Sequence, residues 1–287
     1  MNEPGDEGDR GWSRGRDALA SDYASLRRAE TADRIATGPS FGVGRVLATG
    51  FAVWFRNLIP FLLITALFYA PPWIWAVSVL HGAPTTATLL AANHAFLTAT
   101  FLTIPLNVFV VATLTYGVVM ELHGQRASIG ACIATGLARF LPALGVAIVA
   151  TLCVGVASIA LVIPGIIVFC MLYVATPVSV LERSSVTAAL SRSSELTRGR
   201  RWKIFGILVL LVVANMVSSF LVRELALSAQ PEGMDALFDN MSRLIYVTYA
   251  HQVLAGSLSA VMASVTYYYL RAEKEGTSAG ELAAIFD

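Results

Sequence analysis

The chain has 287 residues, of which 56% are hydrophobic and only 14% are charged, and its formal net charge is +1. Together with a mean hydropathy of +0.67, this composition is typical of a membrane protein and argues against a soluble globular domain.

The two ends of the chain differ in composition from its middle. Residues 1–40 are rich in Arg, Asp, Glu, Gly and Ser and contain no apolar run, so they lack the core of a cleavable signal peptide. We expect them to form a largely disordered cytoplasmic segment. A membrane domain is expected over residues 41–272, followed by a cytoplasmic tail over residues 273–287.

Four long segments contain no Asp, Glu, Lys or Arg. About 20 apolar residues cross the hydrocarbon core of a bilayer as one helix. The first two segments are each long enough for two such helices and the last two for one each, so we predict an all-α fold with six transmembrane helices. The segments are Asn57–Met120, Phe140–Leu181, Ile204–Val222 and Leu244–Leu270.

An amphipathic helix is predicted directly before the first of these segments. Its apolar stripe, at helical spacing, consists of Val43, Val46, Leu47, Gly50, Phe51 and Trp54. A similar stripe recurs over Ile129–Phe140, and a weaker one begins at Ser185 and ends at Gly199, a typical helix C-cap. We therefore predict three transmembrane hairpins, each preceded by a cytoplasmic interfacial helix, with Trp54 and Trp202 at the interface. The alternative is that connections near lipid become amphipathic without an ancestral repeat.

Two features are expected on the side opposite these helices. The second uncharged segment needs a tight turn, and Pro164–Gly165 predicts it, because glycine adopts positive φ at no steric cost. Apolar residues at helical spacing over Pro231–Arg243 predict a short helix lying on the outer leaflet.

The basic residues are distributed asymmetrically between the connecting segments. If the N-terminus is cytoplasmic, all of the 20 Lys and Arg residues except Arg223 and Arg243 lie on the cytoplasmic side. Cytoplasmic connections of membrane proteins carry such an excess. We therefore expect a multi-pass protein of a bacterial-type inner membrane with both termini in the cytoplasm.

Signatures of catalysis are scarce. The four histidines share no spacing with one another or with carboxylates that would suit a metal ion. Nucleophile-elbow, Walker and dinucleotide-binding motifs are absent from the sequence. We expect neither enzyme activity nor a metal ion or other cofactor.

Transport would require polar groups at membrane depth. The candidates are Asn107, Asn215, His251 and Gln252. Their alternative role is hydrogen bonding between helices, and no carboxylate at membrane depth supports an ion-coupled carrier. A channel or carrier for a small or lipidic solute is therefore the alternative function.

The strongest electrostatic feature is a cluster of basic residues before the fifth helix. It consists of Arg192, Arg198, Arg200, Arg201 and Lys203. Such a cluster attracts anionic lipid headgroups by roughly 1 kcal/mol per residue, although the same charges would also hold this loop in the cytoplasm. Because the cluster is short and adjoins the membrane, nucleic acid is not an expected partner. The leading function is a non-catalytic scaffold or accessory protein that contacts anionic lipids, and a membrane protein is a second possible partner.

Three segments carry a resemblance to a known family. They are the stretch from Pro164-Gly165-Ile166 through Pro177 to Glu182, then Ala188–Trp202, and finally Tyr267–Gly276. Together they resemble the membrane domain of the glycerophosphoryl diester phosphodiesterase family, over roughly Phe41 to Asp287. That resemblance implies a six-helix membrane domain, which in the family is sometimes fused to a hydrolytic barrel. A barrel of about 250 residues has no counterpart here, so we expect the resemblance to concern the fold and not a reaction.

The predicted topology is tested by labelling single cysteines with a reagent that does not cross membranes. A cysteine replacing Glu232 should react from outside, because this position follows the fifth helix on the side poor in basic residues. A cysteine replacing Ser194 should react only after the membrane is opened. Reaction of both from outside would contradict the cytoplasmic placement of the termini.

Overall fold

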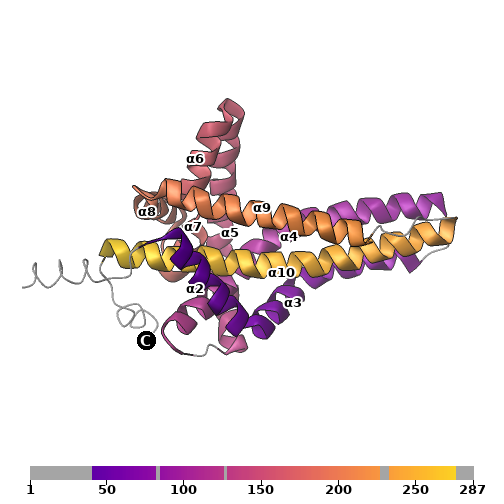
Figure 1. The fold of residues 1–287 in the computed structure, drawn as a ribbon, viewed down its shortest axis with the longest axis horizontal. Helices are drawn as coiled ribbons and strands as arrows, with labels where there is room; N and C mark the ends of the chain where they lie inside the picture. Colours follow the sequence, from indigo (N-terminus) through magenta and orange to yellow (C-terminus); the bar gives the residue numbers. More distant parts are fainter. Residues whose placement is uncertain (1–40, 82–84, 126–127, 227–232, 276–287) are drawn as a thin grey trace, which may run out of the picture. The chain divides into compact units, whose positions relative to one another are not determined.

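The computed structural model describes residues 41–81, 85–125, 128–226 and 233–275 (Figure 1). These residues are almost entirely α-helical and include no β-strand, which confirms the predicted all-α fold. The predicted disordered segment, residues 1–40, and most of the predicted tail lie outside the described residues. Phe41–Leu270 form one unit and are treated below, whereas Arg271–Glu275 belong to a second unit. Within that second unit, Arg271 Nε lies 2.8 Å from Glu275 Oε2.

Six helical segments are long and apolar enough to cross a membrane, as the sequence predicts. Five of them are single helices: α3 (Leu58–Ser78), α4 (Thr86–Leu122), α5 (Ile129–Ala160), α9 (Arg201–Ala226) and α10 (Met234–Glu275). The fourth segment, Val162–Leu181, consists of two helices, α6 (Val162–Leu172) and α7 (Ala175–Leu181). The remaining helical elements are α2 (Val43–Arg56), the short 3₁₀ helix η1 (Val79–His81) and α8 (Val186–Thr197).

Hydroxyl side chains cap the start of three helices. Thr85 accepts a hydrogen bond from the Thr88 N–H at the start of α4, and Ser128 and Ser185 do the same for α5 and α8. Each cap satisfies one of the backbone N–H groups that a helix start leaves without a partner. The end of α8 is followed by Gly199 at φ +84°, in agreement with the predicted C-cap.

Helix α10 is the most buried of the candidate spans. In the apolar segment of α10, 72% of the residues are buried, compared with 11% in that of α5 and 17% in that of α9. Gly256 of α10 lies under the Tyr69 ring of α3, where an added Cβ would come within 3.0 Å of a ring carbon. Four helices, α2, α3, α4 and α9, hydrogen-bond to α10.

Helix α2 packs on α10 with the face that was expected to meet the membrane interface. Trp54 Nε1 donates a hydrogen bond to Ser257 Oγ at 3.0 Å, and Gly50 faces Met262. Trp54 is thus buried against protein, so its predicted place among the interfacial aromatic residues is wrong. The reason is that Gly50 lets α2 approach α10 closely, since a Cβ there would lie 2.9 Å from Met262 Cε.

The predicted second interfacial helix is not separate from the helix that follows it. Ile129–Phe140 continues without interruption into α5, whereas α2 and α3 are divided at Asn57. The Asn57 side chain donates to the Val53 carbonyl at 3.2 Å and so caps the end of α2. In the second stripe, Phe140 follows Arg139 as Asn57 follows Arg56. Phe140 has no polar side-chain group that could cap the end of a helix.

The predicted short helix over Pro231–Arg243 is also wrong in the part that the structure describes. From Met234 onward these residues form the first turns of α10, which runs unbroken to Glu275. Helix α10 begins directly after Gly233, whose φ of +94° is not helical. No residue between Met234 and Arg243 interrupts a helix, so the amphipathic stripe simply continues into the long helix.

The turn between α5 and α6 lies at Leu161 and not at Pro164–Gly165. Leu161 is extended, with φ −164° and ψ 145°. Pro164 falls in the first turn of α6, where a missing N–H is tolerated. Gly165 is helical, so the prediction that it supplies positive φ is wrong. Its role is close packing, because an added Cβ would lie 2.9 Å from the Ser158 Cα.

Substituting Gly165 and Gly155 separately tests this packing role. Gly165→Ala should lower the melting temperature in detergent, because overpacking a close helix contact costs about 1–3 kcal/mol. Gly155→Ala is the matched control in α5, where an added Cβ meets nothing within 4 Å. It should be neutral or slightly stabilising, since alanine is the better helix former. Equal melting temperatures for the two variants would contradict the contact with Ser158.

Candidate functional site

The fourth candidate span is interrupted at Tyr173–Val174, between α6 and α7. Pro177 lacks the N–H that would bond to the Tyr173 carbonyl, and its ring disfavours helix at that point. In the last turn of α6, the Met171 carbonyl accepts a hydrogen bond from Ser193 Oγ at 2.8 Å and has Thr197 Oγ1 at 3.3 Å, although the Thr197 hydroxyl lies closer to the Ser193 carbonyl, at 2.9 Å. These two hydroxyls are one turn apart on α8, so the break in the span fixes α8 in place.

A carboxylate at the end of this span connects three helices. Glu182 follows α7, and its Oε2 lies 3.2 Å from Arg192 Nε of α8. Tyr267 of α10 donates its hydroxyl to Glu182 Oε1 at 2.9 Å. The side chains of Glu182 and Arg192 are only 18% and 30% exposed, so water screens this ion pair less than a surface pair.

A sharp corner joins α8 to α9. Arg198 is extended after the end of α8, and the Arg200 N–H donates to the Thr197 carbonyl at 3.0 Å. Gly199 has φ +84°, a conformation that glycine adopts without strain. Because the chain turns within three residues, Arg198, which follows α8, and Arg201, which begins α9, line the same hollow.

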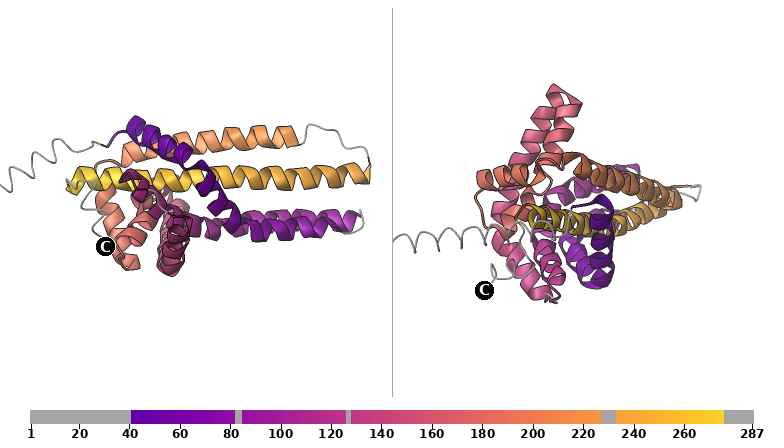
Figure 2. Two further views of the ribbon diagram at one scale, coloured as in Figure 1. Left: turned by 90° about the horizontal axis from the view of Figure 1, so that it is seen from below. Right: turned by 60° about the vertical axis from the view of Figure 1, so that its left-hand side comes forward.

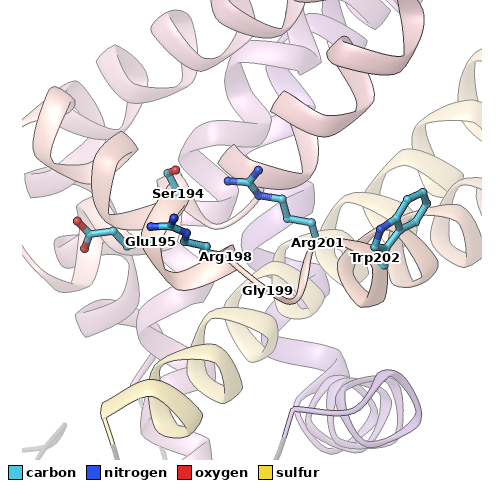
Figure 3. Close-up of a pocket in the computed structure, with 6 residues that line it drawn as sticks. All are labelled: Ser194, Glu195, Arg198, Gly199, Arg201 and Trp202. Atoms are coloured by element: carbon cyan, nitrogen blue, oxygen red, sulfur yellow. The ribbon is translucent and has the colours of Figure 1, made fainter.

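A surface hollow of about 490 Å³ lies at this corner (Figure 3). Its lining residues are Ser194, Glu195, Arg198, Gly199, Arg201 and Trp202. Figure 3 shows the Arg201 side chain extending from the start of α9 back towards Ser194. Its Nε atom is buried and has no hydrogen-bond partner among the residues that the structure describes. Trp202 is 85% exposed beside it.

The hollow is rich in hydrogen-bond donors. Two guanidinium groups and a hydroxyl can each donate to the oxygens of an anion, and guanidinium forks match phosphate geometry. Glu195 contributes one carboxylate to the same lining, so the hollow combines two positive charges with one negative charge. Chemically, the arrangement suits binding of a phosphate-like group.

The structure separates the five basic residues that the sequence groups together. Arg198 and Arg201 line the hollow. Arg192 instead bonds to Glu182, and Lys203 Nζ donates to the Phe41 carbonyl at 3.0 Å. Arg200 is half-buried and is not among the lining residues. Sequence reasoning did not include Ser194, whose only signal was its place one turn before Arg198.

Comparison with known proteins gives one match. The family model described as "Domain of unknown function (DUF7847)" matches residues 60–272. The chain belongs to this family. No curated protein and no solved structure matches the chain. The family match covers nearly all of the six candidate spans together with the α8–α9 corner, and it assigns no activity to them. The resemblance to the glycerophosphoryl diester phosphodiesterase membrane domain stays a prediction.

In this family member, two of the polar residues predicted at membrane depth join helices. Asn107 Nδ2 of α4 donates to Tyr69 Oη of α3 at 2.8 Å. His251 Nε2 of α10 lies 2.9 Å from Ser218 Oγ of α9. Bonds of this kind hold helices together in lipid.

The other two predicted polar residues are placed differently. Asn215 is exposed on α9, and its backbone carbonyl accepts a hydrogen bond from Ser218 Oγ at 3.1 Å. Gln252 is half-buried on α10. The structure therefore shows contacts between helices for Asn107 and His251 only, and these two residues contact different helices.

Neutralising Glu182 tests whether its ion pair fixes α8. Glu182→Gln keeps an acceptor for Tyr267 but removes the charge opposite Arg192, and we expect a destabilisation of about 1–3 kcal/mol. The matched control is Glu195→Gln, because Glu195 is 65% exposed and lies 3.7 Å from the same arginine. This surface pair should contribute less than about 1 kcal/mol. Thermal unfolding in detergent measures both, and equal losses would contradict the structural role of Glu182.

Proposed function

We propose that the protein is a non-catalytic membrane scaffold or accessory protein that binds anionic phospholipid headgroups at the α8–α9 corner. The observation that carries this proposal is that the Arg198 and Arg201 guanidinium groups line one hollow. A phosphodiester in the hollow would accept hydrogen bonds from these groups, and the two arginines outweigh the single carboxylate of Glu195 in the lining.

The surroundings of the hollow favour a lipid over a soluble phosphate. Trp202, at the start of α9, is exposed, as aromatic residues at a membrane interface are. Beyond it, α9 presents a continuous set of exposed apolar side chains: Val209, Leu210, Val213, Val217 and Phe220. A lipid whose headgroup occupies the hollow would have its acyl chains along this face.

The proposed membrane arrangement consists of three helical hairpins, α3–α4, α5–α6 and α9–α10, with α2 and α8 near the cytoplasmic interface. Both termini are placed in the cytoplasm of a bacterial-type cell, following the basic residues. Two ion pairs support the assignment of the joined helix ends to one and the same side of the membrane. Arg56 Nη1 lies 3.0 Å from Glu121 Oε1, and Glu182 pairs with Arg192.

The non-catalytic part of the proposal rests on the sequence, where we found no catalytic motif. Among the described residues, no group of three or more His, Cys, Asp or Glu side chains is placed to hold a metal ion. The alternative of a channel or carrier gains no support from Asn107 and His251, because both hydrogen-bond to neighbouring helices. A membrane protein partner also remains part of the proposal.

Lipid binding is tested with the double variant Arg198→Gln/Arg201→Gln. Native mass spectrometry of the purified protein, titrated with phosphatidylglycerol, measures the first lipid bound. Two contacts of roughly 1 kcal/mol each predict a loss of affinity of about 30-fold. Binding of phosphatidylcholine should change much less, because its headgroup carries no net charge.

The control is Arg223→Gln/Arg243→Gln, which removes the same charge from two exposed residues outside the corner. It should bind phosphatidylglycerol like the wild type. Equal losses in the two double variants would show a non-specific charge effect and contradict the site. Competition by glycerol phosphate as effective as by the lipid would indicate a soluble ligand instead.

A further inference from the structure

Helices α5 and α6 form a hairpin. Its outer part, the residues of α5 after Val146 together with α6, is an exposed apolar arm. Within α5, which the structure describes in full, no residue after Val146 is buried. The large side chains along the arm are widely exposed, for example Leu152 at 62%, Ile159 at 88% and Ile163 at 70%. A contiguous apolar surface of this kind needs an apolar environment or a partner.

The arm runs crosswise to α9 and α10 in every view (Figures 1 and 2). If α9 and α10 cross the bilayer, the arm lies at a large angle to the bilayer normal and does not reach across the core. Its length leads to the same result even for a helix parallel to the normal. Helix α6 has 11 residues before the break at Tyr173, which corresponds to about 16 Å at 1.5 Å per residue. The hydrocarbon core is about 30 Å thick, so α6 reaches only about halfway through it.

The turn at the tip of the arm is chemically unlike a turn in water. Residues 157–166 include no charged side chain, and Ser158 is the one polar side chain among them. Turns in water are usually built from Gly, Asn, Asp and Ser. By contrast, α9 carries the charged and exposed residues Arg223 and Glu224 at its far end.

The backbone of this turn pairs some of its polar groups. The Leu161 N–H donates to the Ala157 carbonyl at 3.1 Å, and the Gly165 N–H donates to the Leu161 carbonyl at 3.3 Å. Pro164 has no N–H. The N–H groups of Val162 and Ile163 and the carbonyls of residues 158–160 still need partners from outside the two helices. An apolar surrounding makes each of these groups costly, so the side chains of the tip, and not its backbone, support its placement in lipid.

We propose that the α5–α6 hairpin is re-entrant: its tip at Leu161 stays inside the bilayer and contacts lipid acyl chains. The chain then crosses the membrane four times, through α3, α4, α9 and α10. Both ends of the hairpin remain on the cytoplasmic side, so the distribution of basic residues is the same as with six crossings. This inference does not depend on the headgroup site at the α8–α9 corner.

The test places a single cysteine at Ile163 in a full-length variant whose Cys132, Cys153 and Cys170 are replaced by alanine. A second variant carries the cysteine at Val162, in case one position disturbs folding. Thr85, the exposed cap of α4, is the control that faces the external water. Right-side-out and inside-out vesicles are treated with a membrane-impermeant maleimide. A nitroxide at the same positions reports collisions with oxygen in lipid and with a nickel chelate in water.

A re-entrant tip should resist the maleimide from both faces and should collide with oxygen much more than with the nickel chelate. The Thr85 control should react in right-side-out vesicles only. Reaction at Ile163 or Val162 from outside at the rate of Thr85 would overturn the proposal in favour of six crossings. Protection from both oxygen and nickel would also overturn it, because a protein and not lipid would then cover the tip.

Discussion

Close packing and hydrogen bonding along α10 hold the helices of the Phe41–Leu270 unit together. Lipid is as apolar as a leucine side chain, so the hydrophobic effect does not drive helices together inside a bilayer. Small and polar residues of α10 take over this role: Gly256 lies under Tyr69, Ser257 accepts from Trp54, and Ser264 lies 3.0 Å from Thr115. Partners from α2, α3 and α4 thus meet one helix face, which explains why α10 is buried while α5 and α9 are not.

The same helix also determines where the candidate headgroup site lies. Tyr267 of α10 donates to Glu182, and Glu182 holds Arg192 of α8. The charge of Arg192 is therefore matched within the protein, whereas Arg198 and Arg201, a turn or more further on, line the hollow. An ion pair within the protein and a proposed ligand-binding pair thus come from one stretch of basic sequence. The difference between them is set by contacts with residues distant in the chain.

The sequence predicted what depends on composition and local chemistry. Segments without charged residues became helices, because backbone groups in an apolar phase must bond within the helix, and the Gly199 cap follows from its tolerance of positive φ. The errors occur where a distant contact decides the outcome. Trp54 was expected at the interface, but Ser257 and Gly50 draw it onto α10. Similarly, Arg192 looked like its basic neighbours, because no spacing in the sequence indicates that Glu182 lies against it.

Helix α8 connects the two surfaces that we propose contact lipid. On one side, Ser193 and Thr197 bond to the Met171 carbonyl at the base of the α5–α6 arm. Ser194, which follows Ser193 on α8, lines the hollow. Two hydroxyls one turn apart fix both the position of α8 along its axis and its rotation about that axis. The orientation of Ser194, and of Arg198 beyond it, is thereby tied to the break in the fourth span. The position of Ser194 beside the hollow is thus set by the same turn of α8 that contacts the end of α6.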